Sequence, residues 1–200
     1  NKNIKGIIVA SSDKAYGKTE KAYTEDAPLK GDHPYDVSKS AADLISQAYR
    51  KTYNVPVVIT RFGNVYGEGD LNLSRIVPGI CKAVIKNEVL DIRSDGTYMR
   101  DYLYVEDVVR GYLILLRDFG KVNGEAFNFS SSENLSVFDI INKAEKSLDV
   151  RISCKILNTA NNEIQYQHLN DSKIRKLGWE NNYSFISILP KIIEWYKNIL

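Results

Sequence analysis

The sequence predicts an α/β fold built on a parallel sheet. Short apolar runs typical of buried strands alternate along the chain with segments of about 10–19 residues whose apolar side chains recur at helical spacing. The first apolar run also ends in small polar residues. This is typical of a parallel strand whose carboxyl end lies at a functional site. We therefore expect helices packed on a parallel sheet.

The first elements follow from these patterns. Residues 4–11 are mostly apolar and predict a buried strand, and the polar, proline-containing residues 13–34 predict a loop. Residues 35–53 carry apolar side chains at helical spacing and predict a helix. Residues 55–62 are rich in β-branched residues, with Pro56 only near the start, and predict the next strand.

The later elements are predicted in the same way, after a glycine-punctuated loop at residues 63–72. Helices are predicted at residues 73–86 (interrupted near Pro78 and Gly79), 105–117, 136–148 (behind a Ser136 N-cap), 171–177 and 184–200. Strands are predicted at residues 89–93, 101–104, 126–130 and 151–157, the last with Cys154 in the core.

Composition excludes several classes of protein. With 27 Lys and Arg against 25 Asp and Glu, the chain lacks the basic excess of a nucleic-acid or membrane-surface binder. The two cysteines form no disulfide framework, which favours a cytoplasmic protein. No apolar run approaches the roughly 18 residues that a membrane span needs. His33 and His168 have no second ligand nearby in the sequence, so we expect no metal site.

The strongest candidate site joins a strand end to a helix start. Ser11-Ser12-Asp13-Lys14 follows the first strand, and Tyr35 precedes Lys39 by four residues, which puts both on one helix face about 6 Å apart. Because a nearby ammonium favours a phenolate, Tyr35 is a candidate general base, and the Ser12 hydroxyl could bridge it to a substrate hydroxyl. The alternative for Tyr35 and Lys39 is an ordinary surface pair. Among the 13 tyrosines, however, only Tyr35 has a lysine four residues on.

The chain lacks one expected motif. A dinucleotide-binding sheet carries a G-x-G-x-x-G turn in its first βαβ unit, and Gly67-Glu68-Gly69 lacks the third glycine and the acidic residue beyond. The sequence also begins at Asn1, inside a pattern. We therefore expect the chain to be the later part of a longer protein.

Seven motifs in order carry a resemblance to a known family. They are Ser11–Gly17, Tyr35 with Lys39, Thr60–Gly67, Arg100–Asp107, Phe127–Phe129, Asp171–Lys173 and Leu177–Trp179. Together they resemble the extended short-chain dehydrogenase/reductases, the NAD-dependent nucleotide-sugar epimerases and dehydratases. Ser12-Asp13-Lys14, and Gly67–Asp70 leading to Arg75–Pro78, most resemble CDP-glucose 4,6-dehydratases, since 4-epimerases usually carry small or neutral residues in place of Asp13 and Lys14.

The resemblance implies the fold and assembly. It implies the C-terminal part of a Rossmann-type parallel sheet with a small α/β substrate-binding lobe. Residues 1–66 and 101–133 would form the sheet with the catalytic residues, and residues 67–100 and 134–200 the lobe. The family also implies a homodimer that packs the Tyr35 helix against its mate.

The resemblance further implies a lyase that uses NAD. Tyr35, with Ser12 and Lys39, would remove the proton from the carbon-4 hydroxyl of a sugar nucleotide while hydride passes to NAD. Asp13 would then protonate the carbon-6 hydroxyl, and Lys14 would take the carbon-5 proton if burial lowers its pKa.

The resemblance also implies the binding residues. Ser11, Tyr35, Lys39 and Phe62 would contact NAD, Asn64 the sugar–phosphate region, and Arg75 and Arg100 the diphosphate. Many relatives place a further phosphate-binding arginine before the Asp171 motif, where this chain reads Asn161-Asn162-Glu163-Ile164.

Two other functions stay open. One is a UDP-sugar 4-epimerase, which loses no water. The other is a truncated, non-catalytic chain that binds a nucleotide sugar or a partner.

Overall fold

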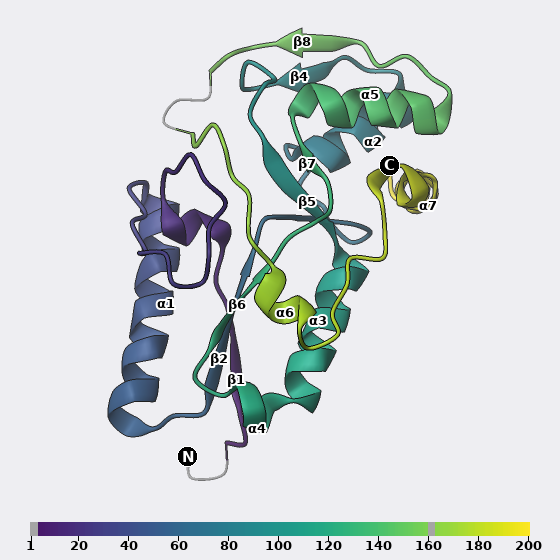
Figure 1. Ribbon diagram of the computed structural model, residues 1–200. Coiled ribbons are helices and arrows are strands. Elements are labelled where there is room, and N and C mark those ends of the chain that lie inside the picture. The colour runs from purple at the N-terminus through teal and green to yellow at the C-terminus, as the bar shows by residue number, and fades with distance from the viewer. Residues whose placement is uncertain (1–3, 160–162) are drawn as a thin grey trace.

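The computed structural model describes residues 4–159 and 163–200 (Figure 1). Three parallel strands form its central sheet, in the order β1 (Ile7–Ala10), β2 (Val57–Phe62) and β6 (Ala126–Phe129). Ile7 lies opposite Val57, and Ile59 lies opposite Ala126. The predicted parallel α/β class is therefore confirmed, with β1 at one edge of this sheet.

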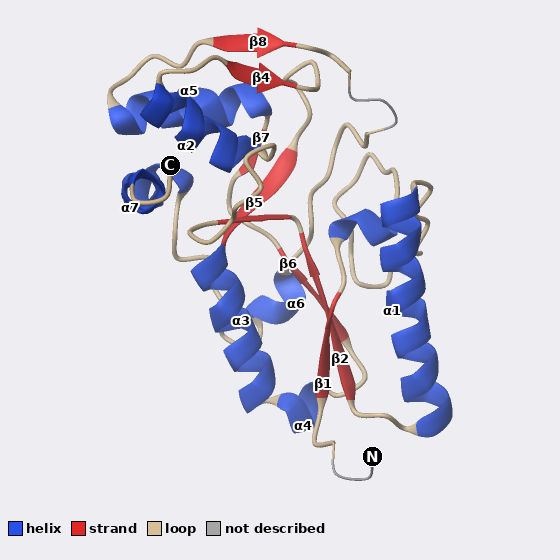
Figure 2. Ribbon diagram, turned by 180° about the vertical axis from the view of Figure 1, so that it is seen from behind, coloured by secondary structure: helices blue, strands red, loops and turns tan. Residues whose placement is uncertain are grey.

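Helices cover both faces of the central sheet. Helix α1 (Pro34–Tyr53) lies on one face, and α3 (Val105–Arg117) and α4 (Phe119–Val122) lie on the other (Figures 1 and 2). Pro34 starts α1, where its missing N–H needs no partner, and Asn54 ends the helix in the left-handed conformation. The short helix α6 (Ser172–Arg175) contacts β6.

Smaller strand groups extend the fold beyond the central sheet. Strand β5 (Arg100–Tyr104) pairs in parallel with β3 (Asn64–Tyr66) and antiparallel with β7 (Asn134–Leu135). Strand β4 (Leu90–Ile92) pairs in parallel with β8 (Cys154–Ile156).

The helices beside these strands complete the second part of the chain. They are α2 (Ile76–Lys86), α5 (Val137–Leu148) and α7 (Phe185–Lys197). A capping box starts α5, because Ser136 and Asp139 exchange side-chain and backbone hydrogen bonds. Among residues 4–159 and 163–200, no helix is both long and apolar enough to cross a bilayer.

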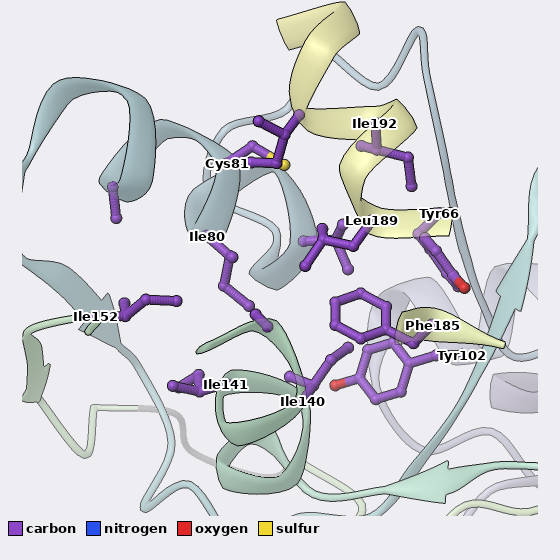
Figure 3. Packing of buried hydrophobic residues seen from close by; sticks show 14 of the residues in the cluster. Tyr66, Ile80, Cys81, Tyr102, Ile140, Ile141, Ile152, Phe185, Leu189 and Ile192 are labelled. Atoms are coloured by element: carbon purple, nitrogen blue, oxygen red, sulfur yellow. The ribbon is translucent and has the colours of Figure 1, made fainter. Parts of the chain in front are cut away.

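Two large apolar clusters form the core. One lies among α2, α5 and α7, where Ile80, Ile140 and Leu189 are fully buried (Figure 3). The other packs α3 against the central sheet around Phe129 and Trp179, whose rings meet edge to face. Trp179 is thus a packing residue.

The structure corrects four details of the predicted elements. The helix predicted at 73–86 begins at Ile76 and continues through Pro78, because a proline in the first turn lacks only an N–H that has no acceptor within the helix. The predicted loops contain strand β3 and a 3-10 helix at Asp13–Tyr16. Cys154 is exposed rather than in the core, because it lies on the outer strand β8.

A buried ion pair joins α1 to the central sheet. Arg61 of β2 donates to both carboxylate oxygens of Asp43 in α1 at 2.8 and 3.0 Å, and both side chains are almost inaccessible to solvent. The same guanidinium donates to the Tyr16 hydroxyl at 2.6 Å and to the Glu25 carbonyl at 2.9 Å. Arg61 therefore holds α1 and the 3-10 helix against the central sheet.

Removing one partner of this pair is expected to be costly. Arg61→Met leaves the Asp43 carboxylate buried and unpaired, which should lower the free energy of unfolding by about 3–5 kcal/mol in urea denaturation. Arg117→Ala is the control: it removes an exposed pair with Asp118 and should cost less than about 1 kcal/mol. Equal costs for the two variants would contradict this role of Arg61.

Candidate active site

A cleft of about 730 Å³ brings five of the predicted site residues together. Lys14, Tyr35, Asn64, Arg75 and Arg100 all line it. They come from the 3-10 helix that follows β1, the start of α1, β3, the residue before α2, and β5. Because these segments are far apart in sequence, the fold alone collects them at one site.

Tyr35 and Lys39 form the helical pair that the spacing predicts. The Lys39 ammonium lies 5.8 Å from the centroid of the Tyr35 ring and donates to the Ala10 carbonyl at 3.1 Å. The bond to Ala10 ties the start of α1 to the end of β1. The Tyr35 ring is 52% exposed, so its hydroxyl is open to a ligand in the cleft.

Ser12 and Asp13 lie beneath the cleft rather than along its wall. Ser12 caps the 3-10 helix, accepting from the Lys14 N–H at 3.2 Å and donating to Asp13 Oδ1 at 3.0 Å. The Ser12 hydroxyl is thus bonded to Asp13, where the sequence predicts a bridge to Tyr35. Burial raises the pKa of Asp13 to about 6, against the opposing effects of Lys14 and of the Ser12 hydrogen bond.

The pKa of Lys14 is shifted in the opposite direction. Burial lowers its pKa, although the neighbouring Asp13 carboxylate opposes the change. Its ammonium donates to Gln167 Oε1 at 2.8 Å. The same burial thus favours the acid form of the Asp13 carboxyl and the neutral form of the adjacent Lys14 amine. Such a pair combines a carboxyl that holds its proton more strongly and an amine that releases its proton more readily than the same groups do in water.

The predicted phosphate-binding arginines differ in exposure. Arg75 is 41% exposed at its side chain and donates to Asp70 Oδ2 and to the Val65 carbonyl, both at 2.7 Å. Arg100 is nearly buried and donates to the Met99 carbonyl at 2.8 Å and to Glu163 Oε2 at 3.4 Å. Asn161 and Asn162, in the stretch where the resemblance implies another arginine, lie outside the described residues.

Two of the residues expected to contact NAD fit that role, and one is turned away. The Ser11 hydroxyl at the end of β1 is buried with no hydrogen-bond partner among the described residues, and Lys39 has ammonium hydrogens left beyond its bond to Ala10. Both suit a hydroxyl-rich ligand such as a ribose. The Phe62 side chain instead stacks on Phe129 in the core, outside the cleft.

The sequence carries no signal for Gln167, which contacts Lys14, or for His168, which contacts Asp101. Gln167 is buried against Lys14, and His168 Nδ1 lies 2.7 Å from the Asp101 carboxylate. Neither position carries a spacing signal, because both lie in an irregular segment whose place is decided by distant contacts. Among residues 4–159 and 163–200, no three His, Cys, Asp or Glu side chains gather as metal ligands do.

Comparisons with known proteins agree on one family. Residues 1–130 match the model of the NAD dependent epimerase/dehydratase family. The chain is 31% identical, over 96% of its length, to a trifunctional UDP-glucose 4,6-dehydratase/UDP-4-keto-6-deoxy-D-glucose 3,5-epimerase/UDP-4-keto-L-rhamnose-reductase of Arabidopsis thaliana, of which it covers 29%. It is 30% identical, over 97% of its length, to a human dTDP-D-glucose 4,6-dehydratase, of which it covers 57%.

Solved structures agree with this assignment. A UDP-glucuronic acid 4-epimerase from Bacillus cereus, in complex with UDP-glucuronic acid and NAD, has a TM-score of 0.92 and 26% identity, over 100% of this chain and 64% of that one. A dTDP-glucose 4,6-dehydratase from Bacillus anthracis, in complex with NAD, has a TM-score of 0.86 and 26% identity, over 96% of this chain and 62% of that one. The chain thus spans less than two thirds of these relatives.

The raised pKa of Asp13 predicts a stability gain on substitution. Because the folded chain binds this proton more tightly than the unfolded chain, stability is expected to fall as pH rises from about 4 to about 6. Asp13→Asn keeps an acceptor for Ser12 and should raise the free energy of unfolding at pH 7 by on the order of 1–3 kcal/mol.

Denaturant titrations at pH 4 and pH 7 test this expectation. The gain should shrink toward pH 4, where the wild-type carboxyl is largely protonated in the folded chain. The control is Asp95→Asn, because hydrogen bonds from Thr97 lower the pKa of that exposed carboxyl and its removal should bring no gain at pH 7. A wild-type protein as stable as Asp13→Asn at pH 7 would refute the argument.

Proposed function

The chain belongs to the NAD-dependent epimerase/dehydratase family, and we propose that it forms the catalytic and substrate-binding part of a nucleotide-sugar 4,6-dehydratase acting on a substrate like CDP-glucose. One observation carries the proposal: Asp13 and Lys14 are adjacent, and burial shifts the pKa of the carboxyl up and that of the amine down. Removal of water from a sugar needs one acid and one base, whereas epimerisation at carbon 4 needs neither group at carbons 5 and 6.

In this proposal Tyr35, Lys14 and Asp13 each transfer a proton at a different atom of the sugar. Tyr35, beside the Lys39 ammonium, takes the proton of the carbon-4 hydroxyl as that carbon becomes a ketone. The ketone acidifies carbon 5, and the neutral amine of Lys14 takes the carbon-5 proton. Asp13 protonates the carbon-6 hydroxyl, which leaves as water. The Lys14 ammonium then returns its proton to carbon 5.

Bound NAD would supply the redox chemistry, by taking a hydride from carbon 4 and returning it to carbon 6. In the proposed site, Ser11, Tyr35 and Lys39 face the cofactor, and Arg75 and Arg100 face the diphosphate, with Asn64 between them. We propose that residues 1–66 and 101–133 carry the sheet and catalytic groups, and that residues 67–100 and 134–200 form the substrate lobe. A phenylalanine at position 62 then serves packing rather than the cofactor.

A UDP-sugar 4-epimerase is the second candidate. The observation that favours it is the TM-score of 0.92 to the Bacillus cereus epimerase, above the 0.86 of the Bacillus anthracis dehydratase. Product analysis separates the two candidates, since only a dehydratase releases a 4-keto-6-deoxy sugar. A product epimerised at carbon 4, with no loss of water, would exclude the dehydratase proposal.

We also propose that the protein is a homodimer through α1. Besides Tyr35 of the cleft, five large apolar side chains of this helix are between 48% and 69% exposed, which is more apolar surface than a surface helix usually leaves in water. They are Val37, Leu44, Ile45, Tyr49 and Tyr53.

Lys14→Ala should separate the two stages of the reaction. Without the amine, formation of the 4-keto-6-deoxy sugar should fall by at least about 10²-fold, while transfer of the carbon-4 hydride to bound NAD continues. Absorbance of the reduced nicotinamide in a single turnover measures the first stage, and mass spectrometry of the sugar product measures the second. Tyr35→Phe is the matched control and should lose both, because it removes the base of the first step. Dehydration that survives in Lys14→Ala would exclude Lys14 as the base.

The dimer has its own test. Leu44→Glu combined with Ile45→Glu puts two charges on the exposed face of α1 and should yield a monomer in sedimentation experiments at micromolar concentration. Lys155→Glu changes the charge of an exposed residue of β8, outside α1, and should leave the dimer intact. A dimer that persists with both glutamates in place would exclude α1 as the interface.

A further inference from the structure

Gln167 lies in a segment that the fold holds rigidly beside the cleft. Its N–H donates to the Met99 carbonyl at 3.1 Å, and its carbonyl accepts from Asn134 Nδ2 at 2.8 Å. The neighbouring Leu169 N–H donates to the buried carboxylate of Asp101 at 2.8 Å. Bonds on both sides of the residue fix its backbone, so its side chain starts from a defined position.

The Gln167 side chain meets Lys14 across 153 positions of sequence. Its amide is fully buried, and Oε1 accepts from Lys14 Nζ at 2.8 Å. Its Nε2 is buried without a hydrogen-bond partner among the described residues. A buried donor left unpaired disfavours folding, so stability does not account for an amide at this position.

The amide has chemical properties that the alternatives lack. An apolar side chain would leave the Lys14 ammonium without this acceptor, and a glutamate would favour the ammonium over the amine. A carbonyl oxygen only accepts. It can therefore bind an N–H of the neutral amine and leave the nitrogen lone pair free for a substrate. An uncharged acceptor is thus the group that orients Lys14 while leaving it basic.

Because three carboxylates already lie near Lys14, it matters that the residue in contact with its ammonium is a glutamine and not a glutamate. Asp13, Asp36 and Glu163 favour the ammonium, whereas burial and Arg100 favour the amine. Burial has the largest effect of these, and Asp13 the next. A fourth carboxylate in direct contact would work against the burial that keeps Lys14 available as a base.

We propose that Gln167 is a positioning residue, an uncharged acceptor that orients the Lys14 amine toward the cleft. The inference rests on the proposed function, in which Lys14 is the carbon-5 base. Gln167 contacts neither substrate nor cofactor in this proposal, since it lies behind Lys14 and outside the cleft lining.

The test follows Lys14 itself. In protein labelled with ¹³C at lysine Cε, the Lys14 signal is assigned by its loss in Lys14→Arg and titrated by NMR. Gln167→Glu should raise the pKa of Lys14 by about one unit or more. Gln165→Glu adds the same charge two residues away, on an exposed side chain, and should move the titration far less. This comparison tests whether the side chain at position 167 contacts Lys14 directly, and the rate measurements that follow test its positioning role.

Activity gives a second, independent measurement. Gln167→Met keeps the volume and adds no charge, so it is expected to fold even where Gln167→Glu does not. It should slow dehydration by about tenfold or more while leaving transfer of the carbon-4 hydride to bound NAD close to wild type. In Gln167→Glu, the rise of the dehydration rate with pH should move to higher pH.

Two results would overturn the inference. One is a Lys14 titration that moves no further in Gln167→Glu than in Gln165→Glu. The other is a Gln167→Met protein that dehydrates at the wild-type rate. Failure of the proposed function gives a different result. In that case the protein dehydrates no nucleotide sugar, or dehydrates one without Lys14, and the shift in the Lys14 titration is still measured. A Lys14-dependent dehydration that is indifferent to Gln167 would refute only the positioning role.

Discussion

The arrangement of this site depends on one buried carboxylate. Asp101 of β5 is 1% exposed and is bonded to the Ser130 hydroxyl, the Leu169 N–H, the Asn134 amide and His168 Nδ1. These groups come from three separate segments of the chain, so the four bonds lock the segments together. A buried charge is tolerated only when donors surround it in this way. The carboxylate thereby fixes the segment that presents Gln167 to Lys14.

A second network fixes the site from the opposite side. Arg61 reaches from β2 to Asp43 in α1 and to Tyr16 in the 3-10 helix. Tyr16 donates in turn to Asn128 of β6 at 2.7 Å. These bonds hold the two elements that carry Tyr35 and Lys14 against the central sheet. The family motifs at Arg61 and Asn128 therefore serve the geometry of the site without lining its cleft.

Asp13 and Lys14 owe their shifted pKa values to the same burial. Removal of water disfavours the charged form of any group, so it raises the pKa of Asp13 and lowers that of Lys14. Adjacent positions in the sequence do not ensure this effect, because in an open loop water would keep both pKa values near their ordinary ranges. Packing of the 3-10 helix beneath the cleft, with Ser12 as its cap, creates the difference.

The sequence by itself determined the α/β class, most helices and strands, the family, and the residues Lys14, Tyr35, Asn64, Arg75 and Arg100 that line one cleft. Periodicity and short motifs carry that information because they are local. Only the tertiary structure decided that Phe62 packs in the core, that the Ser12 hydroxyl bonds Asp13, and that Gln167 meets Lys14. Contacts across 153 positions leave no local pattern, because hydrogen bonding and burial depend on which distant segments the fold brings together.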